Sequence, residues 1–266
     1  MTTLSLRIVP QGRVDMSGVV PEALAGRTAN DIAAQRLQNN GSDVALGDLF
    51  DVTLDDDDTL VIHTHSDCLD YLGKGMTAGT LRVEGPAGHY AGQGLRGGEF
   101  AIHGDAGDCA ANGMTGGLLR IQGNAGNWLG AALIGDRTGM SGGVVVVHGN
   151  VGDRLGDRMR RGLILIRGNA GIACGARLLA GTLVVGGVCG SQPGFGLRRG
   201  SLILGQRPES VPSTFNDSGW VELSYLGLLR QYTEDFLPGL LPAVPRGRRY
   251  MGDQAFGGKG EILVLA

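Results

Sequence analysis

A glycine recurs through the middle of this chain at a nearly constant interval, and each copy precedes a short apolar run. The steps between successive copies are 19, 19, 26, 19, 19 and 19 residues, so one step contains a seven-residue insertion near 131–138. A period of this length is typical of a solenoid, in which each unit buries its apolar side only against its neighbours. The glycines are Gly79, Gly98, Gly117, Gly143, Gly162, Gly181 and Gly200.

Each unit carries the pattern of one short strand. The second and fourth residues after the glycine are large and apolar, as in the pair Leu119 and Ile121, and alternate residues of a strand share a face. Further glycines mark corners that need positive φ. The pattern predicts a mainly β fold, a right-handed parallel β-helix of about seven 19-residue coils across 76–205. Polar residues at one position of consecutive units are predicted to stack along its axis, namely Asp105, Asn124, Asn150 and Asn169.

The segment Gly-Asn-Ala-Gly occurs twice, at 123–126 and 168–171, and has a second interpretation as a phosphate-binding loop. Such a loop must follow a strand and open a helix. Here each copy leads into another coil with no helical stretch between them. The repeated glycines are therefore interpreted as structural.

The segments around the repeat predict smaller elements, so we divide the chain into an α+β cap region at 1–67, the β-helix at 68–206 and a C-terminal region at 207–266. In the cap region, Thr28 and Asp31 fit a capping box for a short helix that Gly41 would end.

Two strands are expected around the acidic run 55–58, which lacks the spacing of a calcium loop and is interpreted as a solvated turn.

An apolar stripe after the repeat predicts a helix that Asp217 or Ser218 would cap, followed by a strand near the end of the chain. The members of the stripe are Val221, Tyr225, Leu228, Leu229, Tyr232 and Phe236.

Charge and composition argue against several classes of protein. The net charge of −3 argues against a nucleic-acid or membrane-surface binder, and no run of 18 apolar residues predicts a membrane span. The first residues lack the pattern of a signal peptide. The four cysteines form no Cys-x-x-Cys pair, which favours free thiols. We therefore expect a cytoplasmic protein.

Arginine outnumbers lysine 21 to 2, which fits either a GC-rich genome or the recognition of carboxylates and phosphates. Seven arginines fall in the later half of neighbouring coils and are predicted to form one basic side, either as solvated corners or as contacts to a polyanion. They are Arg154, Arg158, Arg160, Arg161, Arg177, Arg198 and Arg199.

The outer face of the strands changes from charged to apolar near the fourth coil. The apolar positions are Val146, Leu165, Val184 and Ile203. An apolar stripe on an outer face needs a cover. Either the predicted C-terminal helix or a partner subunit could cover the stripe. The four residues are taken as a candidate partner interface.

Candidate catalytic groups are sparse. His63 and His65 share a strand face but have no evident third metal ligand. His103 and His148 lie two coils apart, about 10 Å at the spacing of strands, which is too far to share a metal. We predict no catalytic residue and no metal site in this chain.

The glycine-rich coils resemble the GXGXG domain at the C-terminus of glutamate synthase large subunits, where it is a structural β-helix. Two further segments, VALGDLFDV at 44–52 and RRYMGDQAFGGKGEILV at 248–264, make the chain look more specifically like the C subunit of the formylmethanofuran dehydrogenase family. That family occurs in an archaeal molybdenum or tungsten dehydrogenase and in the formyltransferase/hydrolase complex of methylotrophic bacteria. The arginine bias favours the bacterial setting.

The resemblance implies a non-catalytic structural subunit that itself binds no cofactor. The bacterial complex converts formyl-tetrahydromethanopterin through formyl-methanofuran to formate in one-carbon (formaldehyde) oxidation. Its implied partners are a metal-dependent amidohydrolase-like subunit and a formyltransferase subunit. The glutamate-rich tail of the methanofuran-type carrier is an implied ligand of the basic side. An independent β-helical enzyme or binder of a polyanionic small molecule is the alternative.

Overall fold

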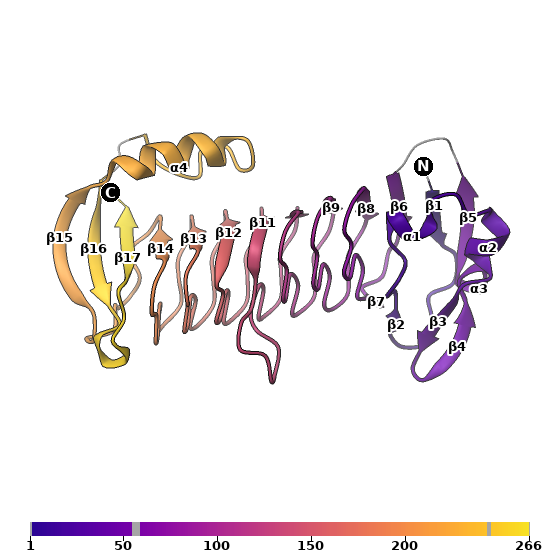
Figure 1. The fold of residues 1–266 in the computed structure, drawn as a ribbon, viewed down its shortest axis with the longest axis horizontal. Helices are drawn as coiled ribbons and strands as arrows, with labels where there is room; N and C mark the ends of the chain where they lie inside the picture. Colours follow the sequence, from indigo (N-terminus) through magenta and orange to yellow (C-terminus); the bar gives the residue numbers. More distant parts are fainter. Residues whose placement is uncertain (1, 55–58, 244–245, 266) are drawn as a thin grey trace.

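The chain folds into a row of stacked coils with a cap at each end (Figure 1). The computed structural model describes residues 2–54, 59–243 and 246–265. Seven strands of one sheet run parallel to one another and follow the seven predicted units, which confirms the β-helix across 76–205. These strands are β8 (Thr80–Glu84), β9 (Glu99–Ile102), β10 (Leu118–Ile121), β11 (Ser141–Val147), β12 (Arg161–Ile166), β13 (Thr182–Val185) and β14 (Ser201–Leu204).

The apolar pairs of the repeat line the inside of the coils, as predicted. Leu119 and Ile121 are fully buried and lie in register with the equivalent residues of the strands on either side. A second line of contact runs through the small residue of each coil, where isolated parallel bridges join Ala87, Ala106 and Ala125 in turn. Each coil is therefore fixed to its neighbour at two places on its circumference.

Two ladders of polar side chains tie the corners together. In the predicted ladder, Asp105 Oδ1 accepts the backbone N–H of Asn124 at 2.7 Å, and Asn124 Oδ1 accepts that of Asn150 at 2.9 Å. Asn150 Oδ1 continues the ladder to the N–H of Asn169 at 2.9 Å, which confirms the stacking of these side chains. A second ladder, which the sequence reasoning missed, joins Asp108 Oδ1 to the N–H of Asn127 at 2.7 Å. Each coil thus satisfies the corner N–H of the next.

The N-terminal cap extends the sheet beyond the first coil. Strand β6 (Thr59–His63) pairs parallel with β8, β1 (Thr2–Leu6) pairs parallel with β6, and β5 (Phe50–Leu54) pairs antiparallel with β1. The two strands predicted around the acidic run are therefore present, and the run itself, Asp55–Asp58, lies outside the described residues.

A second sheet of four strands completes this cap, with three short helices beside it. The strands are β2 (Val14–Asp15), β3 (Arg36–Asn39), β4 (Ser42–Ala45) and β7 (Leu69–Asp70), and the helices are α1 (Pro21–Leu24), α2 (Ala29–Ala33) and α3 (Leu46–Leu49).

The predicted capping box is present at the start of α2, but the predicted end of this helix is wrong. The Thr28 side chain accepts the backbone N–H of Asp31, and the Asp31 carboxylate accepts that of Thr28. The helix stops after Ala33 because the next residues pair as the β3–β4 hairpin. Gly41, with φ of +80°, forms the turn of that hairpin rather than the end of the helix.

The C-terminal region folds back onto the last coils. It contains β15 (Asn216–Glu222), α4 (Ser224–Glu234), β16 (Arg246–Gly252), the 3₁₀-helix η1 (Gln254–Phe256) and β17 (Gly260–Leu265). Strand β17 pairs parallel with β14 and adds one more rung to the stack, which β16 and β15 extend in antiparallel fashion. Figure 1 shows α4 running along the coils from β14 toward β11.

The predicted start of the C-terminal helix is wrong. Asp217, proposed as its cap, lies in β15, where its carboxylate accepts the N–H of Gly219 at 2.9 Å and pairs with Arg248. The helix begins seven residues later at Ser224. The apolar residue Val221 belongs to the strand because it pairs opposite Gly247 of β16. Within the described residues, no helix has both the length and the apolar character needed to cross a membrane.

Candidate functional site

The seven arginines of the predicted basic side separate into two groups with different surroundings. Arg154, Arg158 and Arg177 surround one buried carboxylate and the insertion near 131–138. The other four are exposed and stand where the coil turns into its strand, in pairs that are two coils apart. These pairs are Arg160–Arg161, where β12 begins, and Arg198–Arg199, just before β14.

Arg177 and Arg154 both pair with the carboxylate of Asp157, whose side chain is 1% exposed. Arg177 Nε donates to Asp157 Oδ1 at 2.9 Å, and its Nη2 pairs with Oδ2 of the same carboxylate. This hydrogen bonding raises the pKa of Arg177 above its ordinary value. The guanidinium of Arg154 lies 3.4 Å from Asp157 Oδ2 and 4.8 Å from the centre of the Trp128 ring. Both cations therefore hold neighbouring coils together.

Arg158 holds the insertion. Its Nη1 donates to the backbone carbonyl of Asp136 at 2.9 Å. A small cleft of about 210 Å³ lies beside this contact, lined by Trp128 and by Leu133 and Ile134 of the insertion. The Ile134 side chain is fully exposed. The insertion therefore adds an apolar projection to one coil.

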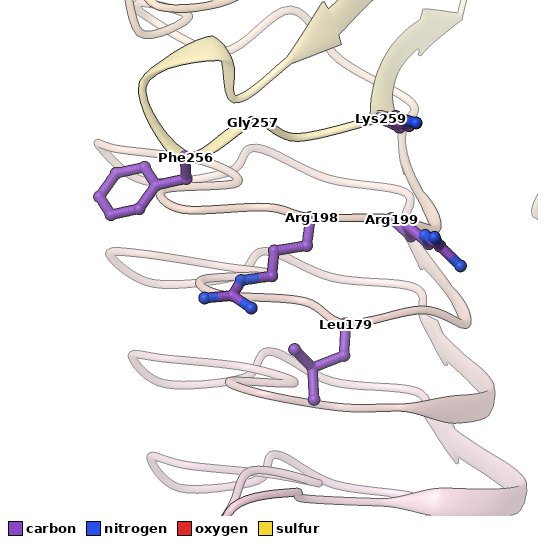
Figure 2. A pocket seen from close by; sticks show the side chains of 6 residues that line it. All are labelled: Leu179, Arg198, Arg199, Phe256, Gly257 and Lys259. Carbon is purple, nitrogen blue, oxygen red and sulfur yellow. The ribbon is translucent and has the colours of Figure 1, made fainter.

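A larger cleft of about 380 Å³ lies between the last coil and the loop that precedes β17 (Figure 2). Arg198, Arg199 and Lys259 supply its three cations, and Phe256 and Leu179 supply its apolar wall. Figure 2 shows the Arg198 side chain between Phe256 at one end and the Arg199–Lys259 pair at the other. Sequence reasoning missed Lys259 because it is 60 residues from Arg199.

A buried carboxylate shapes the loop over this cleft. Asp253 is 1% exposed; its Oδ2 accepts the N–H of Gly196 and its Oδ1 that of Ala255, both at 3.1 Å. The ring of Phe256 meets that of Phe195 edge to face, with centroids 5.4 Å apart. The loop is thus fixed to the last coil at both its start and its tip.

The apolar stripe is covered by this chain's own C-terminal region. Val146, Leu165, Val184 and Ile203 are at most 1% exposed and pack in one cluster with Leu226, Leu237 and Leu241. The partner contact predicted for these four residues is therefore wrong, because their side chains are not accessible to another subunit. The first of the two covers considered, the C-terminal helix, is the one present.

The covering segment runs from α4 to Leu241, and polar contacts hold it to the coils near both of its ends. At its far end, Arg120 Nη1 donates to the carbonyl of Phe236 at 3.2 Å, and Arg167 Nη2 donates to that of Pro238 at 3.0 Å. At its start, the Tyr225 hydroxyl donates to Glu261 Oε1 at 3.0 Å. Burial and the neighbouring Glu261 carboxylate raise the pKa of Tyr225 well above its ordinary value.

The side of α4 that faces away from the coils is also apolar. Leu228 is 71% exposed and Tyr232 53%, although both belong to the stripe predicted from the sequence. We call these two residues the outer face of α4. The helix therefore presents apolar groups both to the coils and to the outside.

The histidines considered for metal binding are not gathered into a site. His63 and His65 are exposed. His103 Nδ1 lies 2.7 Å from Glu84 Oε2, which lowers the pKa of that carboxyl. No group of three or more His, Cys, Asp or Glu side chains suited to a metal ion occurs in the part of the chain that the structure describes.

Comparison with known proteins gives two matches. The chain is 40% identical to the C subunit of the formyltransferase/hydrolase complex Fhc from Methylorubrum extorquens over 88 residues, an alignment that spans only a third of either chain. It is also similar to a chain in the crystal structure of the formyltransferase/hydrolase complex FhcABCD from the same organism, solved with methylofuran. That match covers 99% of both chains with 38% identity and a TM-score of 0.93. No family model matches the chain.

Proposed function

The chain belongs to the family of the C subunit of the formyltransferase/hydrolase complex, and we propose that it is the non-catalytic structural subunit of such a complex. The observation that carries the proposal is the structural match over 99% of both chains. The same match favours the bacterial complex over an archaeal molybdenum or tungsten dehydrogenase.

The assembly that we propose converts formyl-tetrahydromethanopterin through a formylated methanofuran-type carrier to formate. Its chemistry resides in companion chains, a metal-dependent amidohydrolase-like subunit and a formyltransferase subunit. The polar side chains at the corners of the coils support that division, because they hold neighbouring coils together. Asn124 and Asn150 bind backbone amides of the next coil, and Asp157 binds Arg177.

We place this assembly in the cytoplasm. Four free cysteines support the placement, three of them buried, because thiols persist where the compartment is reducing.

The outer face of α4 is the surface that we assign to a partner subunit. Leu228 and Tyr232 are one helical turn apart, so they form one continuous apolar strip. Trp220, 52% exposed, adds to the apolar surface of the same C-terminal region. Aromatic and large apolar side chains on a surface are typical of the centre of a protein–protein interface.

The test is co-purification from the native host with a tag on this chain. We expect the tagged chain to elute with its companion subunits and with formyltransferase/hydrolase activity. Leu228→Asp is expected to weaken that association at least tenfold, since a charge would enter an apolar contact. Val188→Asp is the matched control, because Val188 is a 46% exposed apolar residue on another corner of the coils.

Two results would contradict the proposal. A chain that elutes alone from the native host would not be a subunit, and turnover by that isolated chain would favour the independent enzyme. If Leu228→Asp and Val188→Asp lost partner subunits equally, the outer face of α4 would not be the specific contact with a partner.

A further inference from the structure

We propose that an arginine side chain of a companion subunit inserts between the rings of Tyr90 and Trp128, in the gap that Cys109 leaves in a ladder of aromatic side chains. The inference rests on the proposed function, because it requires a companion subunit. It goes beyond that proposal by naming a second contact surface, away from the strands that α4 covers, and the side chain that this surface receives.

The ladder occupies one corner of the first coils, at positions that are 19 residues apart. All four members have a φ between +59° and +64°. Each donates its backbone N–H to a carbonyl of the next coil, as Tyr90 does to Asp108 at 2.9 Å. The four residues therefore share one backbone conformation and stand in line, one coil step apart. They are Tyr71, Tyr90, Cys109 and Trp128.

Two rings of the ladder are stacked, and a cation lies over each of its ends. The ring centroids of Tyr71 and Tyr90 are 4.8 Å apart and their planes differ by 8°. Lys74 Nζ lies 4.3 Å from the centre of the Tyr71 ring, and Arg154 Cζ lies 4.8 Å from that of Trp128. Arg154 occupies the equivalent position of the next coil, so the face of the Trp128 ring is directed along the axis of the coils.

Cys109 interrupts the ladder between Tyr90 and Trp128. These two residues are two coil steps apart, about 10 Å, and the side chain between them ends in one sulfur atom rather than a ring. A flat group half way between the two rings would lie about 5 Å from each, close to the spacing of the stacked tyrosines. Cys109 is only partly buried, so solvent reaches this position.

The fold does not require aromatic side chains at this corner. In the later coils the equivalent residues are Ala173 and Gln192, with φ of +58° and +59°. Bulky side chains are rare in this left-handed region, and residues held there against their preference are concentrated at functional sites. The rings of Tyr90 and Trp128 are also partly exposed. The ladder therefore has a role beyond the stacking of the coils.

Local charge favours an arginine over a neutral ring in the gap. The faces of the Tyr90 and Trp128 rings are electron-rich, and a guanidinium is flat and cationic, so it stacks on both. Burial and the nearby Asp108 carboxylate raise the pKa of the Cys109 thiol, which places a negative charge beside the gap. Asp108 forms no ion pair with any residue that the structure describes, so its charge remains available to a guanidinium.

The surroundings of the gap fit a protein partner. The insertion near 131–138 follows Trp128 in the same coil, and Leu133 and Ile134 line a cleft with that ring. Ile134 is fully exposed, so the ladder continues into an apolar projection. Arginine and aromatic side chains are enriched at the centre of protein–protein interfaces, where apolar contacts surround them and exclude water.

Alkylation of Cys109 reports directly on the gap. The other three cysteines are buried, so iodoacetamide should modify Cys109 alone in the isolated full chain. We expect this modification, followed by mass spectrometry, to be at least tenfold slower in the complex purified from the native host, because the inserted side chain covers the thiol. Equal rates in chain and complex would overturn this proposal and leave the proposed function intact. A chain that elutes alone would contradict both.

Two variants and a matched control separate an arginine in the gap from other contacts. Cys109→Tyr fills the gap at a φ that Tyr90 already adopts, so it should weaken association at least tenfold with an unchanged thermal midpoint. Asp108→Asn removes the charge but keeps an oxygen to accept the N–H of Asn127, and should weaken association about fivefold. Gln192→Tyr, the control, adds the same ring at the exposed equivalent position of a later coil and should leave association within twofold.

Two results with these variants would contradict the proposal. Unchanged association of Cys109→Tyr, or an equal loss in Gln192→Tyr, would show that the gap receives no side chain. Unchanged association of Asp108→Asn would overturn the assignment to arginine in favour of a neutral ring.

Discussion

Replacing Val184 by aspartate tests whether the C-terminal region is held by the apolar stripe. Val184 is 1% exposed and lies between Leu165 and Ile203 on neighbouring strands, beneath the leucines of the covering segment. An unpaired carboxylate at such a position costs about 3–5 kcal/mol. The new charge reaches water most readily if the covering segment moves away, because the other side of the strand faces the interior of the coils.

The size of the effect follows from the cover. Burying Leu226, Leu237 and Leu241 contributes about 1.5–3 kcal/mol each, and ordering the segment that carries them offsets a large part of that gain. The free-energy cost of keeping the carboxylate buried is therefore larger than the cost of detaching α4 from the coils. We expect the coils to stay folded while the segment from α4 to Leu241 is released.

Hydrogen exchange measures both parts of this prediction in one experiment. Amides of α4 should lose protection on the order of 100-fold, as expected for about 3 kcal/mol, while amides of β8–β14 keep theirs. The control is Arg82→Asp, at the equivalent position of β8, where the side chain is exposed and Ala101 separates it from Arg120, which contacts the cover. Unchanged protection of α4, or equal loss of protection in helix and strands, would refute the reasoning.

Two further predictions concern polar groups of the coils. Asp157→Asn should lower the free energy of unfolding by about 3 kcal/mol in urea denaturation, because Arg177 loses its buried partner; a change below about 1 kcal/mol would contradict that role. The hydrogen bond from His103 lowers the pKa of the Glu84 carboxyl in the folded protein. The pair therefore stabilises the fold fully above the pKa that Glu84 has in the unfolded chain, and this stabilisation is lost as the pH falls through the lower folded pKa. Since both side chains are one-third exposed, His103→Ala should reduce stability by under about 1 kcal/mol at pH 6 and have no effect below about pH 3, measured by urea denaturation across that range.

The coils could be predicted from the sequence because every constraint on them is local. Each unit repeats its apolar pair at fixed distance from a glycine, so the strands β8–β14 and the buried pairs followed from the spacing alone. The ladder from Asp105 to Asn169 followed for the same reason, since equal positions in equal units must lie in line.

The ends of the stack could not be predicted in the same way because they depend on pairing between distant segments. Strand β17 joins β14 across more than 50 residues, and it is this pairing that brings Lys259 beside Arg199. A signal was present, since Gly260 is followed at the second and fourth positions by Ile262 and Val264, as in every coil. That single copy lay outside the regular interval, so it was interpreted only as a strand near the end of the chain.

The error in the C-terminal helix has a similar cause. Apolar residues lie on both sides of α4, and the stripe taken from the sequence includes Leu228 and Tyr232, which the structure leaves exposed. The structure buries Leu226 instead, because this is the side that meets the stripe. Which side of a two-sided helix is buried depends on where its surroundings lie, which the local pattern does not contain.

The stacking of the coils also gives this molecule a fixed length. Eight steps separate β6 from β17, each fixed near 4.8 Å by hydrogen bonds between strands, so the two ends stand about 38 Å apart. The insertion near Ile134 enlarges one corner of a coil and leaves that length unchanged, because β10, β11 and β12 still pair in sequence. Only the gain or loss of a whole 19-residue unit would alter it, so proteins anchored at the two ends could change their separation only in increments of one rung.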